Sequence, residues 1–228
     1  MPLDCTSCPV RERAACAALT AAERSELACL GKGRTYRRGE VVFSAGAPLD
    51  ACATLTSGLL KISQTAQDGS ERILSLVHPA GFVGEMFAPV AHHDVIALTE
   101  SHLCLFPRRS YEAAIERFPA LATALLRRSA QDLFDARAQI ALDGRRSANA
   151  KLATLLLALA RAASHSPCHP ATAFELPLTR GEMAALLGLT IETVSRQLGA
   201  LEEEAIIERE GARGIRLLNA AQLAALAQ

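Results

Sequence analysis

The sequence predicts an α+β protein, in which a region of short β-strands precedes a long helix and a smaller helical domain that ends in a β-hairpin. Three patterns lead to this fold class. Between residues 36 and 106, short β-type runs are separated by glycine turns, as is typical of an all-β barrel or roll. Residues 110–144 have a helical pattern that Pro119 divides into a short and a long helix. Residues 178–201 read as two short helices joined by a tight turn at Gly188.

Composition excludes several classes of protein. The chain has 228 residues and is 50% apolar, which is enough for one or two domains with real cores. Its formal net charge is zero, so any binding to nucleic acid must depend on local arrangement. Trp is absent and aromatic residues make up 4%, which disfavours stacking on single-stranded bases. No stretch approaches a transmembrane span and the N-terminus lacks a signal-peptide core, so we expect a cytoplasmic protein without membrane contact.

Cysteines gather at the N-terminus. Cys5, Cys8 and Cys16 have the spacing C-x2-C-x7-C, and thiolates are ligands for zinc, copper(I) or iron–sulfur clusters. Three are one short of the usual four, and the candidates for the fourth are Cys29, Cys52, Cys104 and Cys168. The alternative is that each is a small half-buried residue without chemistry. Spacing alone does not separate zinc from iron–sulfur.

A short helix follows this segment. Thr20 with Glu23 forms a predicted capping box, and the helix continues to about Leu30. Cys29 is expected on its apolar side together with Leu27, which indicates core packing rather than chemistry.

Within the β-region, turn residues and alternation place several side chains. Asp68-Gly69 predicts a hairpin between two alternating runs. Leu103 and Leu105 are expected in the core, which turns Cys104 to the opposite face, where the N-terminal cysteines can fold over it. His92-His93 is expected to be a solvated loop pair whose side chains point apart.

The long helix carries an apolar seam at spacings of three and four. Its members are Leu121, Leu125, Ser129, Asp132, Ala136 and Ile140. Such a stripe suits pairing with a twin helix in a homodimer, or packing on the chain's own β-region. Asp132 and Asp135 would repel their counterparts across a two-fold axis, which predicts a marginal and switchable dimer. Residues 144–146 then form a predicted hinge.

The two short helices have the features of a helix-turn-helix. Thr179 and Glu182 form a predicted capping box, Gly188 makes the turn, and Thr190 caps the second helix. On the second helix, the predicted buried face consists of Val194, Leu198 and Leu201.

A polar set projects from another face of that second helix. Glu192, Ser195 and Arg196 lie together in its first two turns, where a helix-turn-helix enters the major groove. A guanidinium can bind guanine and a carboxylate can accept from cytosine. The alternative is an ordinary surface helix with one Glu–Arg pair. The two caps, the glycine turn and the convergent polar ends together favour DNA reading.

A hairpin around Gly211 and Gly214 completes a predicted winged helix-turn-helix. Arg213 at its tip is placed for phosphate contact. The acidic run 202–204 is expected to be solvated and away from DNA.

The predicted domains are a cysteine-rich segment at 1–19, a β-roll sensor domain at 20–117, a dimerisation helix at 118–144 and a winged helix-turn-helix domain at 145–228. This order resembles the cyclic-AMP receptor protein/FNR (CRP/FNR) superfamily of bacterial transcription regulators over essentially the whole chain. Its β-roll would then be of the cyclic-nucleotide-binding type. The motif E-x-x-S-R (Glu192, Ser195, Arg196) and the run LTRGEMAALLGLTIETVSR carry the resemblance, which is strongest to the oxygen-sensing FNR branch.

The resemblance implies a cofactor and partners. It implies a [4Fe–4S] cluster on Cys5, Cys8, Cys16 and Cys104, with the C-x2-C-x7-C spacing resembling a variant subgroup. It further implies a homodimer that binds a TTGAT-type palindrome in double-stranded DNA and acts with RNA polymerase. Thr190 and Thr193 are expected beside the base-reading residues at the DNA.

Other readings lead to different regulators. In the cyclic-nucleotide branch an Arg-Ser pair binds the phosphate, and Asp94-Val95 stands at the comparable place, where a carboxylate would repel a cyclic phosphate. A regulator of the same fold gated by thiol redox, zinc or a small-molecule effector remains an alternative. No paired acid and base or nucleophile motif is present, so we expect no enzymatic activity.

Overall fold

The structure is a computed structural model that describes residues 3–143, 147–164 and 169–227, apart from the side chains of residue 135 and residues 138–143. The predicted hinge at 144–146 and Cys168 therefore lie outside the described residues. The chain divides into two compact units, Met1–Asp135 and Ala136–Gln228. No helix among the described residues has the length and apolar character needed to cross a membrane.

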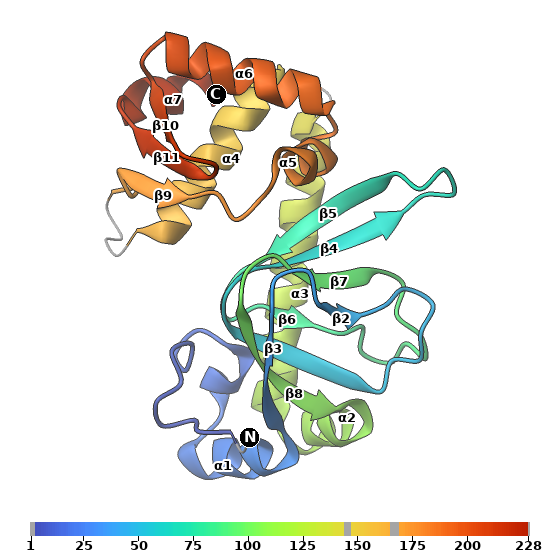
Figure 1. The fold of residues 1–228 in the computed structure, drawn as a ribbon. Helices are drawn as coiled ribbons and strands as arrows, with labels where there is room; N and C mark the ends of the chain where they lie inside the picture. The colour runs from blue at the N-terminus through green and yellow to red at the C-terminus, as the bar shows by residue number, and fades with distance from the viewer. Residues whose placement is uncertain (1–2, 144–146, 165–168, 228) are drawn as a thin grey trace. The chain divides into compact units, whose positions relative to one another are not determined.

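The first unit is a β-roll with helices before and after it (Figure 1). Its elements are η1 (Ala15–Ala18), α1 (Ala21–Leu30), β1 (Lys32–Tyr36), β2 (Val41–Phe43), β3 (Ala51–Ser57), β4 (Leu60–Thr65), β5 (Glu71–Val77), β6 (Phe82–Val83), β7 (Asp94–Ala97), β8 (Ser101–Pro107), α2 (Arg108–Arg117) and α3 (Pro119–Asp143). The boundary between the two units falls within α3.

Two antiparallel four-stranded sheets form the roll in the described part of this unit. Their strand orders are β1-β8-β3-β6 and β2-β7-β4-β5. The core lies between them, because buried side chains come from both sheets: Leu55 and Leu103 from the first, Leu60 and Val95 from the second. The predicted β-roll is therefore confirmed.

Local signals explain two parts of the roll. Gly69 has φ 82° between β4 and β5, and Ser70 N–H donates to Asp68 Oδ1 at 2.9 Å, which confirms the predicted hairpin. Along β8, Leu103 and Leu105 are buried in the roll core, and Cys104 packs on the other side, as alternation predicts. The strand β1 was not predicted, because its sequence KGRTY has no apolar alternation.

A second apolar cluster joins the N-terminal segment (residues 3–19) to the helices of the roll. Leu19 of that segment, Leu27 of α1, Tyr111 of α2 and Leu121 of α3 belong to it. The capping box of Thr20 and Glu23 is present. Cys29 is exposed, so its predicted core packing is wrong. Leu27 packs in the apolar cluster, and Cys29, two residues later, points about 200° away from it around α1.

The second unit is helical with a small sheet. After the end of α3 its elements are α4 (Ala148–Ala163), β9 (Ala173–Glu175), α5 (Arg180–Leu187), α6 (Ile191–Glu203), β10 (Ile207–Glu210), β11 (Gly214–Leu217) and α7 (Ala220–Leu226). The antiparallel sheet has the order β10-β11-β9, so the predicted hairpin gains a third strand that the three-residue run AFE did not reveal. Leu152 and Leu156 of α4 are fully buried beneath α5, α6 and α7.

Candidate nucleic-acid interface and thiol site

The helix-turn-helix is built as the sequence indicates. Thr179 Oγ1 accepts the N–H of Glu182 at 3.1 Å, and Glu182 accepts the N–H of Thr179 at 2.7 Å, which completes the capping box. Gly188 ends α5 in the left-handed region (φ 65°, ψ 41°), where a side chain would be strained. Thr190 then caps α6 by accepting the N–H of Thr193 at 3.2 Å. These contacts set the direction in which α6 leaves the turn.

The two faces of α6 differ in exposure. Val194, Leu198 and Leu201 are buried. Glu192 and Arg196 are exposed and Ser195 is half-buried, so the polar set projects from the first two turns. Hydrogen bonds to Glu192 from its own backbone N–H and from the Thr190 side chain lower the pKa of its carboxyl below the usual 4.5. Glu192 is therefore a hydrogen-bond acceptor at neutral pH.

Two further residues border this surface and were not predicted. Arg180 in the first turn of α5 reaches Ser195, with Nη1 3.5 Å from Oγ. Ile191, the first residue of α6, is 52% exposed, which is unusual for a large apolar side chain. The N-terminal half of the polar face therefore also presents an apolar side chain, of the kind that contacts thymine methyl groups in DNA. Neither residue has a sequence signal of its own, because each depends on how α5 crosses α6.

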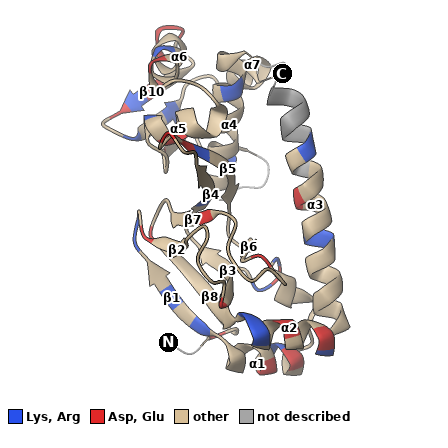
Figure 2. Ribbon diagram, turned by 90° about the vertical axis from the view of Figure 1, so that its right-hand side faces the viewer, with Lys and Arg blue, Asp and Glu red and all other residues tan. Residues whose placement is uncertain are grey.

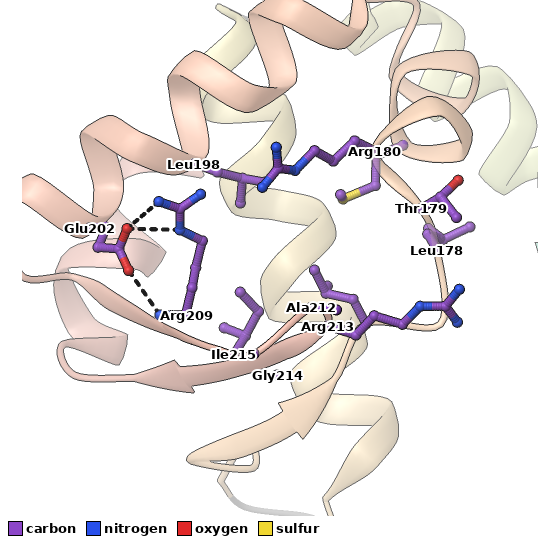
Figure 3. Close-up of a pocket in the computed structure, with 13 residues that line it drawn as sticks. Leu178, Thr179, Arg180, Leu198, Glu202, Arg209, Ala212, Arg213, Gly214 and Ile215 are labelled. Carbon is purple, nitrogen blue, oxygen red and sulfur yellow. Dashed lines mark hydrogen bonds and ion pairs between the residues drawn. The ribbon is translucent and has the colours of Figure 1, made fainter.

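The hairpin of β10 and β11, which is the wing of the winged helix-turn-helix, lies beside this surface of α5 and α6. Arg213 is exposed in the turn between β10 and β11, as predicted, and Gly211 makes that turn with φ 62°. A cavity of about 400 Å³ lies between the wing and the two helices, with Arg180, Arg209 and Arg213 among its lining residues (Figure 3). In the described part of the chain, neither Arg180 nor Arg213 forms an ion pair. Both guanidiniums are available to phosphate.

The prediction for the acidic run 202–204 is wrong at Glu202. It was expected to be solvated, but its carboxylate accepts from the backbone N–H of Arg209 at 3.1 Å and from Nε at 2.7 Å. These hydrogen bonds lower the pKa of the Glu202 carboxyl. The contact spans seven residues across a turn, which no helical periodicity reveals.

Three of the four predicted cysteine ligands, Cys8, Cys16 and Cys104, pack on two apolar clusters that the N-terminal segment forms with the roll. Cys8 and Cys16 pack on an apolar cluster with Val10, and Cys16 and Cys104 both pack on the cluster that contains Leu19. Cys16 therefore belongs to both clusters and links the N-terminal segment to β8.

The pKa values of three of these thiols are raised. Burial raises the pKa of Cys104 to about 12, with further contributions from the charges of Cys8, Cys5 and Cys16. Burial also raises the pKa values of Cys5 and Cys16, followed in each case by the charge of Cys8. All four are free thiols.

The donor set fits a four-thiolate cluster in number and chemistry. No three His, Cys, Asp or Glu side chains among the described residues already converge on one point that would hold a metal ion. A bound cluster would therefore have to draw the thiols closer. Of the other candidates for the fourth ligand, Cys29 is exposed, Cys52 is buried with its Sγ 3.9 Å from the Phe106 carbonyl oxygen, and Cys168 lies outside the described residues.

A second cavity, of about 260 Å³, lies in the roll. Glu85 and His93 are its ionisable lining residues, and no Lys or Arg is among them. His92 and His93 were expected to point apart, but Nδ1 of each approaches a different oxygen of Glu85, because the loop turns toward Glu85 and the backbone N–H of His92 also donates to its Oε1 at 3.1 Å. Burial raises the pKa of Glu85, but hydrogen bonds from His92 and His93 outweigh it and leave that pKa below 4.5. Asp94 Oδ1 accepts the N–H of Ala45. With the Glu85 carboxylate and without a Lys or Arg in its lining, the cavity does not favour a cyclic phosphate.

The predicted seam of α3 divides into two parts. Leu121 is 0% exposed and Leu125 is half-buried, and both pack on the chain's own apolar cluster. The prediction that Leu121 contacts a partner chain is wrong, since its own unit buries it completely. Ala136 is exposed, and the side chain of Ile140 lies outside the described residues.

Further along α3, large apolar side chains are exposed. Leu126, Leu133 and Phe134 are 71%, 51% and 66% exposed. Charged residues of both signs also lie along the helix (Figure 2), and Arg128 Nε binds Asp132 Oδ1 at 3.1 Å. The charge of Asp132 is therefore offset within its own helix.

Known proteins resemble both units. Residues 33–118 match the family model of the cyclic nucleotide-binding domain, and residues 150–226 match that of the Crp-like helix-turn-helix domain. The transcriptional activator protein FnrL of Cereibacter sphaeroides is 36% identical over 222 residues, which cover 96% of this chain and 90% of FnrL. The nitrogen fixation regulation protein FixK of Bradyrhizobium diazoefficiens is 32% identical over 231 residues, covering 98% and 93%. The structure of FixK2 from Bradyrhizobium japonicum superimposes with a TM-score of 0.76 at 28% identity and covers 87% of this chain and 98% of that one.

Proposed function

The chain belongs to the CRP/FNR family of DNA-binding transcription regulators, and we propose that it is an oxygen-responsive member of that family. Membership makes it a regulator and not an enzyme. The proposal concerns three further properties: the DNA sequence that is read, the cofactor, and the change in assembly that couples them. Its place of action would be the cytoplasm, where the DNA lies.

The proposed DNA contacts divide into base reading and phosphate binding. Glu192, Ser195 and Arg196 would read base edges of a TTGAT-type half-site, each good bidentate contact being worth about 1–3 kcal/mol of discrimination. The exposure of Glu192 and Arg196 on the first two turns of α6, with Ser195 between them, supports this role. The phosphate contacts would come from Arg213, and from Thr190 and Thr193 at the start of α6.

The observation that carries the oxygen response is the packing of Cys8, Cys16 and Cys104 on two apolar clusters that share Cys16, with Cys5 three residues before Cys8 in the chain. These four residues would hold a [4Fe–4S] cluster. When bound, such a cluster supplies an oxygen-labile cross-link between the N-terminal segment and β8. The apolar side of the N-terminal segment already packs on the roll and on the start of α3, so fixing or releasing this segment changes the support of α3.

The proposed readout is pairing of α3 with a second copy. The exposed side chains of Leu126, Leu133 and Phe134 would be covered in a dimer, together with Ala136 and Ile140. A dimer sets two recognition helices about one turn of DNA apart on a palindrome. A monomer keeps one half-site and loses most of its affinity. Relatives named transcriptional activators support RNA polymerase as a further partner.

The test is the visible absorption spectrum of the full chain purified without air, with iron and sulfide assays. We expect a brown protein with iron and sulfide, whose colour fades in air while dimers become monomers and DNA binding is lost. Cys104→Ala should remove the colour, and Cys29→Ala, at an exposed thiol outside the four proposed ligands, should leave it. A colourless protein that contains zinc and does not respond to air would overturn the oxygen response and support the zinc alternative.

A further inference from the structure

One carboxylate joins the recognition helix to the wing. Glu202 lies in the last turn of α6, and Arg209 lies in β10, the first strand of the wing hairpin. Oε1 of Glu202 accepts the backbone N–H of Arg209 at 3.1 Å, and Oε2 accepts Nε at 2.7 Å and pairs with Nη2. Both the main chain and the side chain of Arg209 are therefore bound by one residue (Figure 3).

The place of β10 in its sheet explains the backbone contact. The order β10-β11-β9 leaves β10 at an edge, where alternate N–H groups have no neighbouring strand. Glu202 supplies an acceptor for one of them. The side chains of Glu202 and Arg209 are about one-third exposed, and such surface pairs contribute roughly 0–1 kcal/mol to stability. The contact between Glu202 and Arg209 consequently contributes little to the stability of the domain, and its main effect is on the position of β10 against α6.

The tip of the wing follows closely along the chain. Arg213 is four residues beyond Arg209, and its carbonyl accepts the N–H of Leu176 at 2.8 Å. Because the hairpin is short and closed by antiparallel pairs, a displacement of β10 from α6 also displaces Arg213.

On charge alone, a carboxylate at position 202 should weaken DNA binding. DNA is an anion, and a carboxylate beside a phosphate contact weakens the attraction. Glu202 also forms an ion pair with Arg209 and so neutralises a cation that would otherwise add to the surface. We propose that Glu202 is a positioning residue for DNA binding, which holds the wing at the distance from α6 that lets Arg196 and Arg213 reach one half-site. This inference rests on the proposed phosphate contact of Arg213.

Two alanine variants separate position from charge. Glu202→Ala removes the link, and Glu203→Ala removes the same charge one residue later, from an exposed side chain without an ion pair among the described residues. If charge alone mattered, both variants would bind a TTGAT-palindrome duplex at least as tightly as the unchanged chain. We expect Glu203→Ala to do so. Glu202→Ala should bind about tenfold more weakly, with the slope of log affinity against log salt reduced by about one for each chain bound, as for a lost phosphate contact.

The Arg213→Ala background identifies the route of the effect. In that background Glu202→Ala should cost no further affinity. In the chain that keeps Arg213, Glu202→Gln retains an acceptor for the Arg209 N–H and should therefore lose less affinity than Glu202→Ala. Circular-dichroism melting of each variant shows that the domain is folded. Binding by Glu202→Ala as tight as by Glu203→Ala, or an equal loss with and without Arg213, overturns the positioning role. An Arg213→Ala variant with unchanged affinity and salt slope instead shows that the phosphate contact itself is wrong, and the inference falls with it.

Discussion

The guanidinium of Arg24 holds the backbone at Cys16: its Nε donates to the Cys16 carbonyl oxygen at 3.1 Å. Nη2 of the same side chain donates to the carbonyls of Leu19 at 3.0 Å and Ala17 at 3.4 Å. Arg24 lies in α1, so it fastens the end of the 3-10 helix η1 to the element that follows it. The position of the third cysteine thus depends on a residue eight places further along the chain.

Arg24→Ala should loosen the N-terminal segment even without a bound cluster. Losing these hydrogen bonds lowers the free energy of local opening by about 1–2 kcal/mol, so alkylation of Cys16 in the reduced, metal-free chain should be about tenfold faster. Mass spectrometry after timed alkylation measures this rate. Arg13→Ala, at an exposed arginine in the same segment, is the matched control and should leave the rate unchanged. Equal rates for the two variants would show that the Arg24 contacts do not hold the segment.

Arg196 and Arg213 should have different effects on sequence preference. Arg196→Ala removes a proposed base contact, so it should cost about 1–3 kcal/mol on the cognate half-site and relax the preference at one base pair. Arg213→Ala should weaken binding uniformly across sequences, because phosphate is the same in all of them. Competition among duplexes that each carry one changed base pair distinguishes the two. Uniform weakening by Arg196→Ala would contradict its base-reading role.

The buried and the exposed apolar residues of α3 should separate stability from assembly. Leu121→Ala should destabilise the chain by about 2–5 kcal/mol, as for a buried leucine, without changing the association of the folded protein. Leu133→Ala should leave the unfolding free energy of the monomer nearly unchanged and weaken dimerisation by about 1.5 kcal/mol or more for each chain. Denaturant unfolding and sedimentation equilibrium measure the two quantities. A change of association by Leu121→Ala, with none by Leu133→Ala, would place the interface elsewhere.

The capping box of α1 predicts a dependence on pH. Hydrogen bonds from the Thr20 backbone and side chain lower the pKa of Glu23 below its usual 4.5. A carboxyl whose pKa is lower in the folded state adds stability above its unfolded pKa, and this stability is lost as pH falls through the folded value. NMR titration should show Glu23 ionising below pH 4.5, and Thr20→Ala should move its midpoint upward. Thr20→Ser, which keeps the hydroxyl, should leave the midpoint low.

Local signals predicted much of the fold. The threonine caps, the left-handed Gly188 and the alternation at Leu103 and Leu105 depend on neighbours within a few residues, and each prediction is confirmed. Pro119 likewise begins α3 after the short helix α2, as the helical pattern indicates. The order of units follows from these signals.

Contacts between distant residues could not be predicted in the same way. The approach of His92 and His93 to Glu85 depends on the fold of a loop, and the contact between Glu202 and Arg209 depends on where β10 passes α6. The burial of Leu121 depends on the N-terminal segment, which the periodicity of α3 alone does not include. Three-dimensional packing decides such cases.

The proposed pairing of α3 would also make the response depend on the concentration of the protein. The stretch from Leu126 to Phe134 covers about two and a half helical turns, a short contact for two helices. Where monomers predominate, doubling the number of chains raises the number of dimers about fourfold by mass action. Transcription of the chain's own gene would then tune how steeply its targets respond, independently of any chemical signal at the cysteines.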